Sequence, residues 1–278
     1  MYLNHTSIFN NSITSPVKQS WRERRLLGSL IRRDIKLRYQ GSLIGKYWNF
    51  IHPLALIIIY TVVFSKVMGA KIGGLAGGGT VSYTIYLCAG LLPWNAFMEV
   101  ISRGTNSYLE YAHLIKKVSF PSNIIHLIGP GTATFNFLIS MVFFIGLMVF
   151  MGVEMHPRML MVIPLYTLQI AFTIGLSMTL AVLQVFFRDV SQFIAIILQL
   201  LFWGTPIVYI FDRIPNLMQT MVKLNPMYYF ITGYQDIFVY GKNISEATWL
   251  ICSLLAGAGL LTGLKVVMMA QKDIPDEI

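Results

Sequence analysis

Six stretches of this chain are apolar over the length of a membrane-spanning helix. The hydrocarbon core of a bilayer is about 30 Å thick, and a helix needs about 20 apolar residues to cross it. Only 12% of the residues are charged, against about 25% in soluble domains. The sequence therefore predicts an all-α integral membrane protein with six transmembrane helices. The expected spans are 47–65, 82–101 (placed between Lys71 and Arg103), one within 118–151, 159–187, 190–210 and 247–264.

A basic segment runs directly into the first of these spans. The helix expected before it has Leu27, Ile31 and Ile35 on one face and basic residues largely on the other. Such a helix lies along the surface of a bilayer. Two interpretations are open. The helix anchors the chain to anionic lipid, worth about 1 kcal/mol per basic residue, or it is a lever that lies against a cytoplasmic partner.

The positions of Lys and Arg predict the orientation. With both termini inside, 15 of the 21 basic residues fall on the cytoplasmic side, as the positive-inside bias requires. This bias accounts for the net charge of +9 better than nucleic-acid binding does. We expect a cytoplasmic segment over 1–46, a six-span domain over 47–269 with an inner loop over 103–121, and a cytoplasmic tail over 270–278.

The outer segment 211–246, between the last two spans, is rich in aromatic residues and broken by Pro and Gly. It is too apolar for a solvated loop and too broken for a span, so we expect short re-entrant or interfacial helices. The aromatic residues form either the usual belt at the membrane interface or a lining along which a polar, uncharged polymer slides. The candidates for such a path or gate are Trp94, Trp203, Tyr209, Tyr228, Tyr229, Phe230 and Tyr234.

Several chemistries find no support in the sequence. The stretch Gly41–Tyr47 imitates a phosphate-binding loop but has the wrong glycine spacing and no Ser or Thr after Lys46. The histidines are scattered, no catalytic set or metal spacing is visible, and Cys88 and Cys252 are expected to be small buried apolar residues. We expect no enzyme activity, metal or cofactor in this chain.

Two further features concern the spans themselves. Gly259 and Gly263 form a small-xxx-small pair that favours close helix packing. Glu99 and His126 are the candidates for deep ionisable groups, but both are expected near span ends. An ion-coupled carrier would need such groups deep in the membrane.

Several short motifs, in order, resemble the ABC-2 type permeases that export lipid-linked polysaccharides, over about residues 25–265. The most extensive opens the chain: Arg33-Asp34-Ile35-Lys36-Leu37-Arg38-Tyr39, then Ser42-x-x-Gly45-x-x-Trp48 and Pro53. The others are Gly90–Trp94, Leu114–Pro121, Phe187–Val190, Thr205–Tyr209 and Asn225-Pro226. The opening resembles the O-antigen and teichoic acid branches more than the capsule branch.

The resemblance implies a homodimer paired with two cytoplasmic ATPase subunits that bind ATP and magnesium. It favours the lever interpretation, and it implies that the outer helices form a gate. The residues that would couple to the ATPase are Arg32, Arg33, Asp34, Lys36, Arg38, Tyr108, Glu110, His113, Lys116 and Lys117.

These observations lead to one preferred hypothesis. The chain is the permease subunit of an ATP-driven exporter of undecaprenyl-linked polysaccharide, with O-antigen preferred, in a bacterial inner membrane. The alternatives are an ABC-2 exporter of a small molecule or drug, a membrane anchor for glycan enzymes, and an ion-coupled glycolipid flippase.

Overall fold

A computed structural model describes residues 23–37, 45–60, 62, 80–116 and 124–278, and these contain helices, turns and coil but no strand. The helices are α2 (Arg24–Leu37), α3 (Trp48–Tyr60), α4 (Thr80–Glu110), α5 (Ala112–Ile115), α6 (Ile125–Phe150), α7 (Val162–Phe186), α8 (Val190–Trp203), α9 (Asn216–Leu224), α10 (Pro226–Phe238), α11 (Glu246–Ala270) and α12 (Ile274–Glu277). Short 3-10 turns cover Gly45–Tyr47 (η2), Pro157–Met161 (η5) and Phe211–Arg213 (η6).

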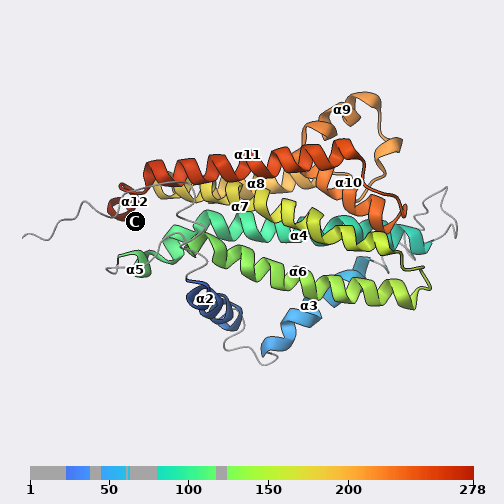
Figure 1. The fold of residues 1–278 in the computed structure, drawn as a ribbon, viewed down its shortest axis with the longest axis horizontal. Coiled ribbons are helices and arrows are strands. Elements are labelled where there is room, and N and C mark those ends of the chain that lie inside the picture. Colours follow the sequence, from blue (N-terminus) through green and yellow to red (C-terminus); the bar gives the residue numbers. More distant parts are fainter. Residues whose placement is uncertain (1–22, 38–44, 61, 63–79, 117–123) are drawn as a thin grey trace, which may run out of the picture.

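The long helices run side by side as one elongated bundle (Figure 1). Among the described residues, four helices are long and apolar enough to cross a membrane: Tyr83–Glu110, Ile125–Phe150, Pro157–Phe186 and Glu246–Ala270. The first of these is the most buried, and α4 packs against α6, α7, α8 and α10. The all-α class is therefore confirmed for the described residues, four of whose helices have the length and apolarity of membrane spans, and α4 lies at the centre of the bundle.

The remaining predicted spans differ from expectation. α8 is apolar but ends at Trp203 instead of reaching Ile210, because Gly204, Thr205 and Pro206 stop the helix. α3 covers Trp48–Tyr60, and the predicted end of the first span lies largely outside the described residues. Six spans thus stay a prediction.

The helix that contains the second predicted span continues beyond the predicted end of that span. α4 continues past Ile101 to Glu110, so residues 103–110 belong to the helix instead of the predicted loop 103–121. Within this extension, Gly104 lies against Ser177 of α7 with no room for a Cβ atom. Glu99 therefore lies in the interior of α4, and its position near the end of the membrane span stays a prediction.

The predicted glycine packing is confirmed between α7 and α11. A Cβ atom on Gly263 would lie 2.3 Å from the carbonyl oxygen of Gly175, and one on Gly175 would lie 2.0 Å from that of Gly259. The backbones of the two helices therefore touch directly. Because this small-residue face is used within the chain, it cannot serve as an interface with a second copy.

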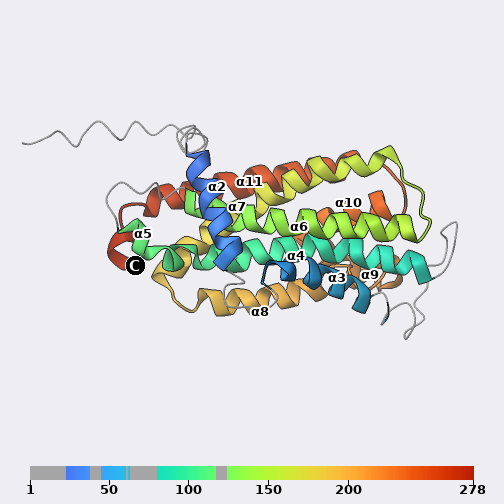
Figure 2. The ribbon, with the colours of Figure 1, turned by 90° about the horizontal axis from the view of Figure 1, so that it is seen from below.

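α2 lies across the bundle instead of along it. It is seen end-on in Figure 1 and crosses the long helices in Figure 2, near the end that carries α5 and the C-terminus. α9 stands off the bundle at the opposite end (Figure 1). A helix perpendicular to the spans is the arrangement expected for a segment that lies in the plane of the membrane surface.

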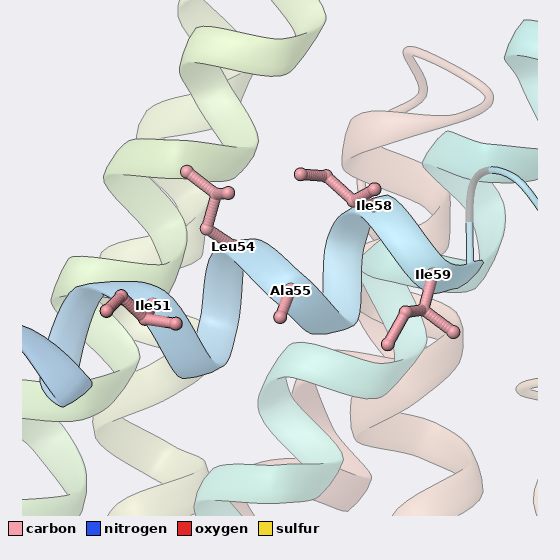
Figure 3. Close-up of a pocket in the computed structure, with 5 residues that line it drawn as sticks. All are labelled: Ile51, Leu54, Ala55, Ile58 and Ile59. Carbon is pink, nitrogen blue, oxygen red and sulfur yellow. The ribbon is translucent and has the colours of Figure 1, made fainter.

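One face of α3 carries exposed apolar side chains. Figure 3 shows the open groove along this helix, lined by Ile51, Leu54, Ala55, Ile58 and Ile59. Ile58 and Ile59 are each about half exposed in the described part of the chain. An uncovered apolar face of this kind suits contact with lipid or with another membrane protein.

Candidate functional site

An ion pair joins the crossing helix α2 to the central helix α4. Asp34 on α2 accepts a hydrogen bond from the guanidinium of Arg103 on α4. The same carboxylate oxygen accepts a second bond, of 2.8 Å, from the hydroxyl of Thr132 on α6. Asp34 therefore connects α2 to two helices of the bundle at once.

The network continues along α4 and α6. Glu99 lies one turn before Arg103, with an N–O distance of 3.5 Å between them. The side-chain amide of Asn136 donates to both carboxylate oxygens of Glu99, at 3.0 and 2.9 Å. Two carboxylates thus share one guanidinium, and the side chains of Asp34 and Arg103 are largely removed from solvent. We call Asp34, Glu99, Arg103, Thr132 and Asn136 the coupling junction.

A cluster of apolar side chains lies beside the junction and packs α2 against α6; we call it the seat of α2. Leu30 of α2 is buried against Ile124 and Ile128, with Tyr111 at the edge of the same cluster. A Cβ atom on Gly131 would lie 2.3 Å from Cδ1 of Ile31, so this glycine leaves the space that Ile31 fills. The apolar face of α2 therefore packs on protein at the start of α6.

Tyr111 carries an uncharged phenol in this seat. Burial raises the pKa of Tyr111 to about 12, and the nearby carboxylates of Asp34 and Glu110 add to that rise. The side chain follows the last residue of α4, where the chain turns into α5. A neutral ring at this corner adds no further charge to the cluster around Arg103.

The residues expected to couple to an ATPase fall into two groups. Exposed side chains belong to Arg32, Arg33, Lys36, Glu110, His113 and Lys116. Asp34 is turned inward to Arg103, and Tyr108 is buried with its hydroxyl 2.9 Å from Nε2 of His126. Both side chains are thus engaged in contacts inside the bundle in this conformation. Arg38 and Lys117 lie outside the described residues.

A second polar cluster holds the turn after α8. The amide of Asn225 donates to the hydroxyl of Thr205 at 2.7 Å, and its carbonyl oxygen accepts from the backbone N–H of Met227 at 3.0 Å. Asn225 therefore caps α10 and ties it to the end of α8. The amide of Gln235 donates to the carbonyl of Pro206 at 2.7 Å. Hydrogen bonds thus join the motif Thr205–Tyr209 to the motif Asn225-Pro226 and to α10.

The aromatic candidates also divide into two groups. Trp94, Phe230 and Tyr234 are buried in the core, and the hydroxyl of Tyr234 donates to Gln169 at 2.8 Å. Burial removes these three from any path that a substrate could touch in this conformation. Trp203 is 61% exposed, and the partly exposed group comprises Tyr209, Tyr228 and Tyr229. Tyr228 packs against Phe211 and Tyr229.

The polar side chains that connect the helices were not predicted from the sequence. Thr132 and Asn136 on α6, Gln169 on α7 and Gln235 on α10 each bridge two elements. They could have been recognised as polar residues within apolar spans, because a buried amide or hydroxyl there needs a hydrogen-bond partner. The predicted burial of Cys88 and Cys252 is confirmed. Within the described ranges, no group of three His, Cys, Asp or Glu residues could hold a metal ion.

Comparison with known proteins adds to this geometry. The family model described as ABC-2 type transporter matches residues 25–239. The chain is 30% identical over 217 residues to a Klebsiella pneumoniae protein named O-antigen export system permease protein RfbA, covering 78% of this chain and 81% of that one. It is 27% identical over 259 residues to the protein of the same name from Myxococcus xanthus, covering 92% and 96%. It is also 22% identical over 264 residues to a Neisseria meningitidis capsule polysaccharide export inner-membrane protein, CtrC, covering 91% and 93%.

Proposed function

Because this chain belongs to the ABC-2 type transporter family, we propose that it is the permease subunit of an ATP-driven exporter of lipid-linked polysaccharide, with O-antigen as the substrate. One observation carries the proposal: the similarity to two proteins named as O-antigen export permeases extends over most of the chain. In this proposal the polysaccharide is undecaprenyl-linked. The chain spans the inner membrane of a bacterium several times, as its apolar helices require.

The proposed partners are two copies of a cytoplasmic ATPase and a second copy of this chain. The sequence has no complete phosphate-binding loop, so the partner would bind ATP and magnesium and this chain would be no enzyme. The exposed basic residues of α2 and the exposed His113 and Lys116 near α5 lie toward one end of the bundle. Their position supports a docking surface for the ATPase on the cytoplasmic side, with both chain termini on that side.

The coupling junction suggests how ATP binding could move the spans. A push on α2 reaches α4 through the contact of Asp34 with Arg103 and reaches α6 through the contact of Asp34 with Thr132. Since only a partner that binds two conformations unequally can shift their populations, the ATPase must bind one arrangement of α2 more tightly. Exposed Arg32 and Arg33 would then contact the ATPase, and Asp34 would transmit the resulting movement of α2 to α4 and α6.

The substrate path is proposed at the opposite end of the bundle. Tyr209, Tyr228 and Tyr229 remain partly exposed there, together with exposed Trp203. Tyrosine and tryptophan rings can cover the C–H faces of sugars while their polar tips exchange hydrogen bonds. The helices α9 and α10 would form the gate, inserted from the outer side as re-entrant elements.

Deleting the gene in the source bacterium tests the proposed substrate. We expect loss of one surface polysaccharide together with accumulation of its lipid-linked form inside, both reversed by the wild-type gene. Unchanged amounts in both pools, in a strain that makes the polymer, would refute polysaccharide export. A changed drug-sensitivity profile in that case would support the alternative, an ABC-2 exporter of a small molecule.

The docking surface has its own test. Replacing both Arg32 and Arg33 by Glu reverses two exposed charges and should strongly reduce co-purification of the ATPase with the permease. The control reverses exposed Arg213 in η6 at the opposite end. Undiminished co-purification of the double variant would show that α2 is no docking surface.

A further inference from the structure

Two buried side-chain atoms lack a hydrogen-bond partner in the part of the chain that the structure describes. They are Oγ of Ser107 on α4 and Nδ1 of His126 on α6. Native proteins satisfy the large majority of buried polar atoms, so each exception calls for an explanation. Ser107 and His126 line the same cavity, so a single partner there is the simplest explanation for both atoms.

Ser107 and His126 line one small cavity between α4 and α6. About 10 Å³ of the cavity is accessible to the centre of a water molecule, which is about the minimum that one water requires. The remaining walls come from Arg103, Gly104, Glu110, Tyr111, Ile125, Gly129 and Pro130. The cavity is therefore polar enough to hold a water and too small for a larger ligand.

The geometry of Ser107 sets it apart from its neighbours. Hydroxyls in these helices normally donate to a carbonyl one turn earlier, as Thr105 does to Ile101 at 2.7 Å and Ser140 does to Asn136 at 2.8 Å. Ser107 makes no such bond. Its hydroxyl therefore remains available for a partner in the cavity.

The chemistry of His126 selects the kind of partner. Its Nε2 atom lies 2.9 Å from the hydroxyl of Tyr108, and a neutral imidazole has one N–H and one acceptor nitrogen. If Tyr108 donates to Nε2, then Nδ1 carries the hydrogen and needs an acceptor. If Nε2 donates, then Nδ1 needs a donor. A water molecule satisfies either tautomer and can pair with the hydroxyl of Ser107 at the same time.

We propose that this cavity binds one structural water, which bridges Oγ of Ser107 and Nδ1 of His126. The water fastens the last turns of α4 to the first turn of α6, beneath the seat of α2 and beside Arg103 of the coupling junction. Its ligands are positioning residues: they fix how α4 and α6 meet where α2 docks. This inference concerns the chain itself and is independent of the substrate.

The sign of a stability change tests the proposal. In the purified full-length protein, Ser107→Ala removes one partner of the water and should lower the thermal midpoint by about 2–4 °C. Without a bound water, the same change removes an unpaired hydroxyl and improves helix propensity, so the midpoint would stay or rise. Ser102→Ala, on the exposed side of α4, is the matched control. An unchanged or higher midpoint for Ser107→Ala overturns the proposal.

A second measurement does not depend on variants that fold. An experimental structure at a resolution that reveals ordered waters should show density within hydrogen-bond distance of both atoms. An empty cavity with both atoms still unpaired would overturn the proposal, whatever polysaccharide or other substrate the transporter carries.

Discussion

The ion pair between Asp34 and Arg103 allows a quantitative prediction about the stability of this permease. Arg103 is the cation shared by two carboxylates, those of Asp34 and Glu99, so the three groups together carry a formal charge of −1. Arg103→Gln leaves two unneutralised carboxylates close together, whereas Asp34→Asn leaves one balanced pair. We therefore expect Arg103→Gln to be the more damaging change.

The magnitude follows from burial and charge. Two unit charges about 4 Å apart attract by about 4 kcal/mol at an effective dielectric constant of about 20. The side chains retain 21% and 15% exposure, and the cost of removing them from water offsets part of the attraction. A charged hydrogen bond contributes about 1.5–3 kcal/mol net, which is our expectation for Asp34→Asn. For Arg103→Gln we expect about 3–5 kcal/mol, the cost of leaving a buried charge unpaired.

A double-mutant cycle checks this reasoning. The free energy of unfolding is measured for the purified wild type, both single variants and the double variant. The double variant should lose about 1–3 kcal/mol less than the sum of the singles. In the assembled transporter, Asp34→Asn should retain ATPase binding and hydrolysis while export falls. Additive stability losses, or an Asp34→Asn variant that exports normally, would refute the junction as a mechanical link.

Two other predictions concern packing and the substrate path. Gly263→Ala should destabilise the chain by about 1–3 kcal/mol in an unfolding assay, because its Cβ atom would collide with the backbone of α7. Gly257→Ala is the control: a Cβ atom there meets open space, so the change should be neutral or slightly stabilising in the same assay. Replacing Tyr228 and Tyr229 together by Ala should impair export while the permease still assembles with its ATPase; a normal amount of surface glycan in that variant would exclude these rings from the path.

Four of the predicted spans coincide with helices long and apolar enough to cross a membrane, but the sequence did not predict which of their faces point inward. Residues facing lipid and residues facing the core are both apolar, so periodicity carries little information inside a span. This is why Trp94 and Tyr234, chosen as path residues, proved to be core residues. The early end of α8 was predictable from the sequence, since Gly204 and Pro206 interrupt the apolar run. The contact of Gly263 with α7 was predictable in kind, although the sequence did not identify Gly175 as the partner.

The coupling junction can also be recognised in the sequence, from the spacing of its charged residues. Asp34 is the only acidic residue of α2, and it follows Ile31, Leu30 and Leu27 by three, four and seven positions. That spacing puts a carboxylate on the apolar face of the helix, where it cannot remain unpaired when the face is buried. Its partners repeat the pattern, since Glu99 and Arg103 lie one turn apart on α4 and Thr132 and Asn136 lie one turn apart on α6. Polar groups at helical spacing on three separate apolar faces can satisfy one another only if those faces meet. An acid within the apolar face of an interface helix therefore indicates where that helix docks, whereas the exposed basic residues around it remain available to a partner.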